Sequence, residues 1–248
     1  MKEVKVDENK ITPLRVNDKT DSLTLKHTVF NLPMRCILCA KSGQGKNTQL
    51  LHILCNENMK YNKIFKGEDI YIFCPDPLAD AKMKLLIDFY DIDDNNLYSG
   101  EALDEDSLSH VYHGLIDEFK EDRTKKPVII IDDYSSTGKA STRFNIINTL
   151  FCNSRKYNIN IFFLSQHYSH TSLSIRNNAN VLLIGNCSNK NLKLICDEHN
   201  MLKTDKEFRD LFRKHTTEQF QFFIINYTSP FKRMYLNSEY KPIEHSGT

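Results

Sequence analysis

Six short apolar runs alternate along the chain with segments that are compatible with helices, and this alternation restricts the fold more than any other feature. The runs occupy residues 35–40, 69–74, 128–132, 159–165, 181–185 and 221–227. The helix-compatible segments lie at 46–55, 79–89, 108–119, 144–157, 192–201 and 205–214. Continuously apolar strands that alternate with helices predict a mostly parallel central sheet with helices on both faces. The expected fold class is therefore α/β.

The length predicts a single domain. A chain of 248 residues can bury the core of one α/β domain but is short for two. We expect a flexible arm at 1–22, one domain at 23–240 and a short tail at 241–248. Residues 23–30 alternate between apolar and polar side chains, which is compatible with an edge strand.

Charge and cysteine content exclude several function classes. The formal net charge is +1, so the chain has no overall attraction to nucleic acid or to a membrane surface. Its 7 cysteines are scattered through apolar segments, which favours reduced, buried thiols in a cytosol-like compartment. Cys36 and Cys39 have the spacing of a redox pair, but alternation along a strand would send them to opposite faces. No apolar run reaches the ~18 residues that a membrane span needs, and the start MKEVKVDENK is too polar for a signal peptide.

The stretch CAKSGQGKNT at 39–48 follows the first apolar run and resembles a phosphate-binding P-loop, G-x-x-x-x-G-K-[ST]. In such a loop, backbone N–H groups and the positive end of the following helix face the phosphates of a nucleotide. The alternative is a strand–turn–helix joint without a ligand. We interpret the stretch as a site for ATP. The candidate binding residues are Ser42, Gly43, Gln44, Gly45, Lys46, Asn47 and Thr48.

Two positions depart from the P-loop pattern. Ala40 replaces the first glycine, at a strand exit where an ordinary backbone angle can serve. Asn47 replaces the Ser or Thr whose hydroxyl holds Mg²⁺, although an amide oxygen is also an acceptable ligand for a hard cation. Thr48 comes one residue later and would be rotated by about 100° around the helix. Asn47 is therefore predicted to be a metal ligand.

Two further apolar runs end in polar side chains. VIIIDD at 128–133 ends in Asp132, which would position Mg²⁺, and Asp133, which would polarise the attacking water. This acid pair could instead cap a helix or face solvent. The run at 160–165 precedes Gln166, whose amide would orient water beside the γ-phosphate. In the additional-strand class of P-loop ATPases, the strand before such a glutamine lies between the P-loop strand and the acid-bearing strand.

Together these motifs resemble the FtsK–HerA superfamily of DNA-pumping ATPases, and within it the genome-packaging ATPases of large DNA viruses (poxvirus-like) and of virophages. The segments that carry the resemblance are AKSGQGK, VIIIDD, FCNSRKYNINIFFLSQ and LSIRNNANVLLIG. The resemblance spans roughly 25–237 and implies a RecA-like P-loop NTPase of the additional-strand type. It further implies a homo-oligomeric ring that uses ATP and Mg²⁺ to move double-stranded DNA into a capsid. The departures at Ala40, Asn47 and Asp133 bear on the rate of hydrolysis more than on nucleotide binding.

The resemblance also implies partners and a location. A ring ATPase often takes an arginine from the neighbouring subunit, and this contribution can be worth about 10³–10⁵ in rate. Arg155 is the first candidate and Arg176 the second, although each could be a surface residue or a salt-bridge partner. DNA would be held through its phosphates without sequence preference. A capsid or portal-like component would dock the ring in the host cytoplasm or in a virus factory, without a membrane.

Two other functions stay open at this stage. A P-loop nucleotide or small-molecule kinase would need a mobile, arginine-rich lid, and no dense arginine segment follows the apolar runs. A nucleotide-binding scaffold that assembles with little hydrolysis would be consistent with Asn47 and Asp133. A kinase of this kind also has no need for paired acids and a glutamine at the ends of neighbouring strands.

Overall fold

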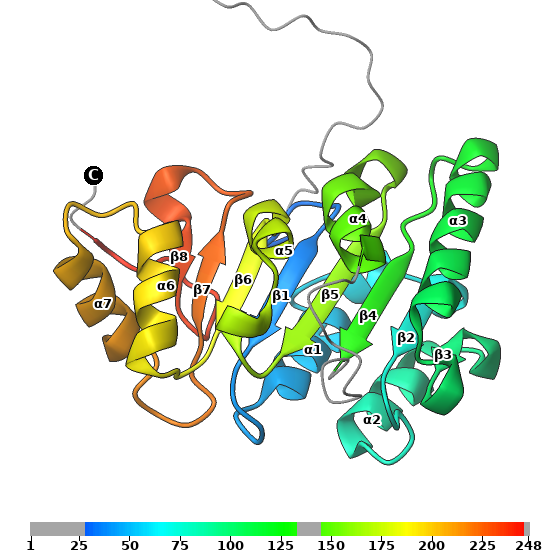
Figure 1. The fold of residues 1–248 in the computed structure, drawn as a ribbon, viewed down its shortest axis with the longest axis horizontal. Helices are drawn as coiled ribbons and strands as arrows, with labels where there is room; N and C mark the ends of the chain where they lie inside the picture. Colours follow the sequence, from blue (N-terminus) through cyan, green and yellow to red (C-terminus); the bar gives the residue numbers. More distant parts are fainter. Residues whose placement is uncertain (1–27, 133–144, 246–248) are drawn as a thin grey trace, which may run out of the picture.

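The computed structural model describes residues 28–132 and 145–245, which form an eight-stranded sheet between two layers of helices (Figure 1). The strand order is β3-β2-β4-β5-β1-β6-β7-β8. The strands are β1 (Arg35–Cys39), β2 (Ile70–Phe73), β3 (Leu97–Tyr98), β4 (Val128–Asp132), β5 (Asn160–Ser165), β6 (Val181–Ile184), β7 (Phe223–Asn226) and β8 (Tyr235–Leu236). All neighbours from β3 to β6 are parallel, whereas β7 and β8 pair antiparallel. The predicted α/β fold with a mostly parallel sheet is confirmed.

The helices cover both faces of the sheet, as predicted. One face packs against α1 (Lys46–Cys55) and α2 (Ala81–Tyr90). The other face is covered by α3 (Glu105–Glu121), α4 (Asn145–Asn153), α5 (Leu173–Asn178), α6 (Asn189–His199) and α7 (Asp205–Lys214), which lie in front of the sheet in Figure 1. Short 3-10 turns link the elements at Tyr61–Lys63, Gly67–Asp69, Asp94–Asn96, Gly100–Ala102, Ser154–Tyr157, Tyr168–His170 and Phe231–Arg233.

Alternation along β1 divides its side chains between the two layers. Cys36 and Leu38 belong to the cluster on the α1 and α2 side, and Ile37 and Cys39 belong to the cluster on the opposite side. Both cysteines are buried and unbonded, and burial raises the pKa of the Cys39 thiol to about 12. The pair therefore packs as apolar side chains and lacks the geometry of a redox site.

Three small elements were absent from the sequence prediction. β3 and β8 are 2 residues long each, and α5 is 6 residues long, so none carries a readable apolar period. β3 and α3 give the polar segment 91–126 an edge strand and an amphipathic helix of its own. Residues 28–30 of the predicted strand at 23–30 are not in a strand, and 23–27 lie outside the described residues, as does the predicted arm.

Part of the predicted C-terminal tail packs against the domain. Ile243 is buried, and its N–H donates to the carbonyl oxygen of Tyr235 at 2.9 Å. Pro242 forms a bridge with Leu236 of β8. Within the described ranges, no helix has both the length and the apolar character that crossing a membrane requires.

The position of β5 decides which strand ends meet. β5 lies between β4 and β1, in the arrangement expected of the additional-strand class. The register pairs Cys39 with Ser165 and Asp132 with Leu164. Because the three strands are parallel, the residues that follow each of them emerge at the same edge of the sheet. This carboxyl edge is the lower one in Figure 1.

Candidate functional site

A pocket of about 460 Å³ opens at the carboxyl edge of β1, β4 and β5. Its lining consists of Ser42, Gly43, Gly45, Lys46, Asn47, Ala79, Asp80, Ala81, Lys82, Asp132 and Gln166. The structure thus brings Lys46, Asp132 and Gln166 to one cavity from three separate strand ends. The volume falls in the range of about 300–1,000 Å³ that small-molecule and cofactor sites occupy.

The glycine-containing loop has the backbone of a phosphate cradle. Gly43 and Gly45 adopt φ angles of 73° and 93°, in the left-handed region that residues with a Cβ rarely enter. Gly45 is also the N-cap of α1, so the free N–H groups of the first helical turn face the pocket edge. Lys46 Nζ donates to the carbonyl oxygen of Ala40 at 3.0 Å, which folds the side chain across the loop. The loop therefore presents backbone donors and one ammonium group to the same space.

Ala40 fits because of a residue on the neighbouring strand. Its φ is not positive, so the backbone at this position needs no glycine. A Cβ added to Gly185, at the end of β6, would lie 2.8 Å from the Ala40 Cβ. The alanine methyl thus occupies the space that Gly185 leaves open. The departure from the P-loop pattern at this position is structural and does not obstruct the cradle.

The sequence prediction missed the four pocket residues at 79–82, at the start of α2, and two of them, Asp80 and Lys82, are charged. Asp80 is the N-cap of this helix, and its Oδ1 accepts hydrogen bonds from the N–H groups of Lys82 and Met83 at 2.8 and 3.0 Å. Its Oδ2 accepts from Asn47 Nδ2 at 2.9 Å. Lys82 Nζ in turn donates to Thr48 Oγ1 at 2.6 Å. The first turns of α1 and α2 are therefore joined by two side-chain hydrogen bonds.

These contacts orient the side chain of Asn47, which the sequence predicts to be a metal ligand. Because Nδ2 of Asn47 is directed to Asp80, its amide oxygen remains an acceptor at the pocket. Mg²⁺ is usually held by one or two carboxylates together with the phosphates of the ligand. Asp132, Asp80 and Asn47 line the same pocket, so the two carboxylates and the amide oxygen are the groups that could hold such an ion. In the part of the chain that the structure describes, no cluster of three or more His, Cys, Asp or Glu forms a metal cage.

The remaining loop candidates divide between the pocket and its surroundings. Ser42 lines the pocket. Gln44 is outside the lining, and its N–H donates to the carbonyl oxygen of Lys41 at 3.2 Å within the loop turn. Thr48 is exposed and is the acceptor for Lys82. Asp133 lies outside the described residues.

Arg155 lies at the edge of the sheet opposite to the pocket. It belongs to the 3-10 turn Ser154–Tyr157, which precedes the first residue of β5. The 6 residues of β5 separate Arg155 from Gln166, a span of about 20 Å at ~3.3 Å per residue. Arg155 therefore has no access to the pocket of its own chain, and any contact with a nucleotide would be made on another subunit.

Arg176 is engaged in a largely buried ion pair with Glu198. Its guanidinium lies 2.7 Å from Glu198 Oε1, its side chain is 10% exposed, and it also donates to the carbonyl oxygen of Thr171. The Tyr168 hydroxyl donates to Glu198 at 2.7 Å and joins His199 to this cluster. Burial lowers the pKa of His199 to about 4. Arg176 is thus a salt-bridge partner in this structure, and a role in trans would require release of Glu198.

Comparison with known proteins agrees with this architecture. The Sulfolobus turreted icosahedral virus protein B204, described as a DNA-packaging ATPase, superposes with a TM-score of 0.59 at 14% identity, over 86% of this chain and 100% of that chain. B204 of Sulfolobus turreted icosahedral virus 2 in complex with AMPPCP gives a TM-score of 0.55 at 13% identity, over 85% of this chain and 98% of that chain. At this identity the likeness concerns the fold.

The sequence comparison adds the family. No curated protein sequence matches the chain significantly. Residues 24–235 match the family described as Poxvirus A32 protein, which covers most of the 248 residues and both ends of the sheet. The phosphate loop, the acid after β4 and the glutamine after β5 all lie within the matched range. On these grounds the chain belongs to the poxvirus A32 protein family.

Proposed function

We propose that this chain is an ATPase that uses ATP hydrolysis to package viral double-stranded DNA. The observation that carries the proposal is the convergence of Lys46, Asp132 and Gln166 on one pocket at the carboxyl edge of the sheet. Membership of the poxvirus A32 family supports it. B204, which shares the fold, is described as a genome packaging NTPase and has been solved with AMPPCP and with ATP-gammaS, which favours ATP as the nucleotide.

The pocket residues divide the work of phosphate cleavage. The backbone of 42–48 and the Lys46 ammonium would bind the phosphates, with Lys82 as a second cation at the same opening. Asp133 would polarise the attacking water, and the Gln166 amide would orient it. Asn47 and Asp132 would hold Mg²⁺, with Asp80 beside them. Bound there, the ion would neutralise charge that develops on the phosphoryl oxygens.

The family resemblance and the position of Arg155 support a ring assembly. An arginine at the amino edge of the sheet can serve a nucleotide only across a subunit interface, which favours a homo-oligomeric ring. Such a ring would hold double-stranded DNA through its phosphates, without sequence preference. A capsid or portal-like component would dock it, in the host cytoplasm or in a virus factory.

The decisive experiment is phosphate release from ATP, measured with and without duplex DNA. We expect turnover that rises when DNA is added, because a translocating motor couples hydrolysis to its track. Transfer of the γ-phosphate to a small acceptor would instead support a nucleotide kinase. Tight nucleotide binding without any release would support an assembly scaffold. Either of these results would contradict the proposed motor.

The hydrogen bond between Asp80 and Asn47 predicts a metal defect in the variant Asp80→Asn. Asparagine caps helices about as well as aspartate, so α2 should persist. The variant loses a negative charge beside the proposed metal position and a charge-assisted hydrogen bond, a loss of about 1.5–3 kcal/mol. We expect the Mg²⁺ concentration that half-saturates nucleotide binding to rise about tenfold or more. Titration of a fluorescent ATP analogue at varied Mg²⁺ measures this concentration directly.

Asp104→Asn is the matched control for this experiment. Asp104 is the N-cap of α3 and accepts a hydrogen bond from the N–H of Ser107 at 2.7 Å, but it is not part of the pocket lining. This control should leave the Mg²⁺ dependence unchanged. An Asp80→Asn protein with the Mg²⁺ dependence of the parent chain would exclude Asp80 from metal binding.

A further inference from the structure

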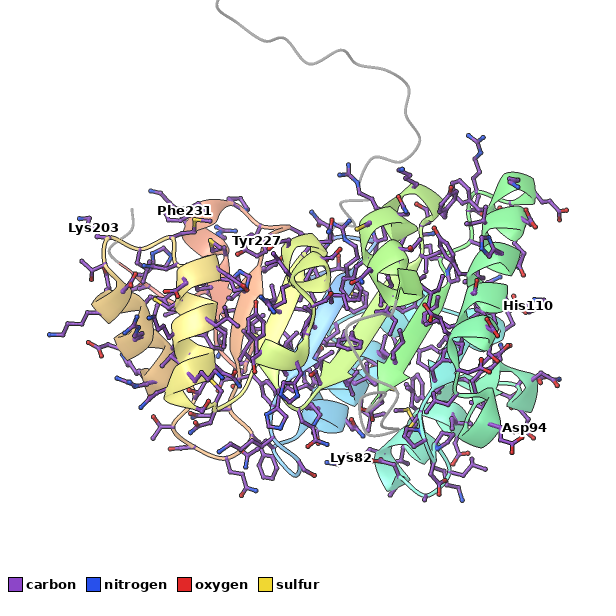
Figure 2. All side chains as sticks on the ribbon, in the orientation of Figure 1. Lys82, Asp94, His110, Lys203, Tyr227 and Phe231 are labelled. Atoms are coloured by element: carbon purple, nitrogen blue, oxygen red, sulfur yellow. The ribbon has the colours of Figure 1, made fainter. Side chains whose placement is uncertain are left out.

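A second cavity, of about 280 Å³, lies at the edge of the sheet opposite to the nucleotide pocket. Its lining residues are Asn31, Leu32, Pro33, Arg35, Arg155, Asn180, Tyr227 and Thr228. They come from the starts of β1, β5 and β6 and from the end of the antiparallel β7. Figure 2 labels Lys82 of the nucleotide pocket at the lower edge and Tyr227 of the second cavity at the upper edge. The two cavities are therefore separate sites.

The described residues that line the second cavity include two arginines and no acidic side chain. Among the described residues, neither Arg35 nor Arg155 has a carboxylate within 4.0 Å. Nε of Arg35 is buried and has no hydrogen-bond partner among these residues. Burial lowers the pKa of Arg35, and the neighbouring charge of Arg155 lowers it further. Two like charges thus face one cavity, and no described residue supplies a counterion within 4.0 Å.

Such an arrangement is costly unless an anion compensates it. A buried charge without a partner loses its hydration, and a second cation nearby adds repulsion. Arg176 in the same protein shows the usual solution, because Glu198 neutralises it at 2.7 Å. In the part of the chain that the structure describes, no carboxylate neutralises Arg35 or Arg155 in this way. Features that destabilise a fold locally are commonly retained at binding sites, where the ligand supplies what is missing.

The backbone holds Arg35 rigidly in place. Its N–H donates to Asn180 Oδ1 at 2.7 Å, and its carbonyl oxygen accepts from the N–H of Asn180 at 3.0 Å. Asn180 Nδ2 also donates to the carbonyl oxygen of Pro33 at 3.0 Å. The start of β1 is therefore fixed to the start of β6. Arg35 forms the half-buried floor of the cavity, and the exposed Arg155 lies at its rim.

We propose that Arg35 and Arg155 form a binding site for a single phosphate group. The planar guanidinium donates paired hydrogen bonds to phosphate oxygens, and two of them can neutralise a dianion. The cavity is smaller than the ~300–1,000 Å³ of typical small-molecule sites, so it suits a phosphate group better than a whole nucleotide. The phosphate has two possible sources. It is either the terminal phosphate of a nucleotide bound to the adjacent subunit, a source that rests on the ring proposed above, or a phosphate of the DNA backbone.

The test uses the full chain with the P-loop disabled by Lys46→Ala. Binding of sodium tripolyphosphate and of a short duplex DNA is measured by calorimetry, with and without the added change Arg35→Gln. Loss of a charged hydrogen bond should weaken binding about tenfold or more. Arg35→Lys, which keeps the charge but loses the paired geometry, should weaken binding less. Lys203→Gln removes one exposed positive charge away from both cavities and should change neither affinity.

The two arms identify the source of the phosphate. If Arg35→Gln weakens only the binding of tripolyphosphate, the phosphate is that of a nucleotide. If it weakens the binding of DNA and reduces the slope of log K against log salt concentration by about 0.9, the phosphate is one contact with the DNA backbone. If Arg35→Gln changes neither the affinity for tripolyphosphate nor that for DNA, and its melting curve matches that of the parent protein, the phosphate site is excluded. This outcome is independent of the proposed ATPase, because phosphate release from ATP is measured separately on the chain with an intact Lys46.

Discussion

Replacing Lys46 by alanine should reduce ATP turnover by at least about 10²-fold, the effect of removing one preorganised donor from a charged transition state. Lys46 is the first residue of α1 and lines the pocket together with Asp132 and Gln166. Its ammonium group contacts only a backbone carbonyl, that of Ala40, and it pairs with no carboxylate in the described residues. The charge is thus available to phosphate oxygens. Phosphate release and nucleotide binding should both fall.

The fold should tolerate this change, which makes the result interpretable. Alanine is a good helix former, and the change removes only one part-buried hydrogen bond, that to the carbonyl oxygen of Ala40. Asp133→Asn is the informative companion variant, because it should still bind ATP and fail to cleave it. Lys203→Gln controls for the loss of one positive charge. Unchanged turnover in Lys46→Ala would show that the loop is a structural turn.

The second large effect is expected for Arg155→Ala, which should lower turnover by about 10³–10⁵ if this arginine serves the neighbouring pocket. The position of the residue leaves no other route. Arg155 precedes β5 at the amino edge of the sheet, whereas Gln166 of the pocket follows β5 at the carboxyl edge. The length of this strand keeps Arg155 away from the pocket of its own chain. Nucleotide binding to an isolated subunit should therefore remain normal in this variant.

Mixing two inactive variants tests the same idea in a different way. Arg155→Ala subunits keep an intact pocket, and Lys46→Ala subunits keep Arg155. Where a Lys46→Ala subunit lies next to an Arg155→Ala subunit in a ring, it can donate its Arg155 to the intact pocket of that neighbour. The interface between these two subunits then contains a complete site. Activity should return in the mixture and depend on the ratio of the two proteins. Absence of recovery at every ratio, in a mixture that assembles, would exclude donation by Arg155.

Arg176 is a poor alternative for this role. Its guanidinium already pairs with Glu198 and lies over the ring of Tyr168, with 5.4 Å to the ring centroid. Removing one partner of such a buried pair leaves the other charge uncompensated, which destabilises the fold. A loss of activity in Arg176→Ala would therefore need a melting curve beside it, whereas the exposed Arg155 can be changed with little effect on stability.

The sequence predicted long elements well and very short ones poorly. The bounds of α1 and α7 agree with the predicted ranges 46–55 and 205–214. Each of these helices has a clear N-cap, which is Gly45 for α1 and Thr204 for α7. β3 and β8 could not be predicted, since a strand of 2 residues carries no period and forms only where a neighbouring strand offers hydrogen bonds.

The same distinction applies to the candidate site. Lys46 was identified from the P-loop pattern after β1, whereas Asp132 is the last residue of one apolar strand and Gln166 directly follows another, and parallel strands end at one edge. Asp80 was missed because seven residues at 74–80 separate the end of β2 from the start of α2. No local pattern indicates that this turn returns to Asn47. Only the packing of α2 beside α1 brings the carboxylate to the amide.

Local patterns of apolar and polar residues were therefore sufficient for the α/β class, for most of its elements and for the polar residues at three strand ends. Packing was required for everything that depends on which strands are neighbours. The order β4-β5-β1 assembles the nucleotide pocket, and the adjacent starts of β1 and β5 bring Arg35 next to Arg155. Burial likewise pairs Arg176 with Glu198. The physical reason is that periodicity reports which face of an element is apolar, whereas the partner of a charged group depends on contacts between residues far apart in the chain.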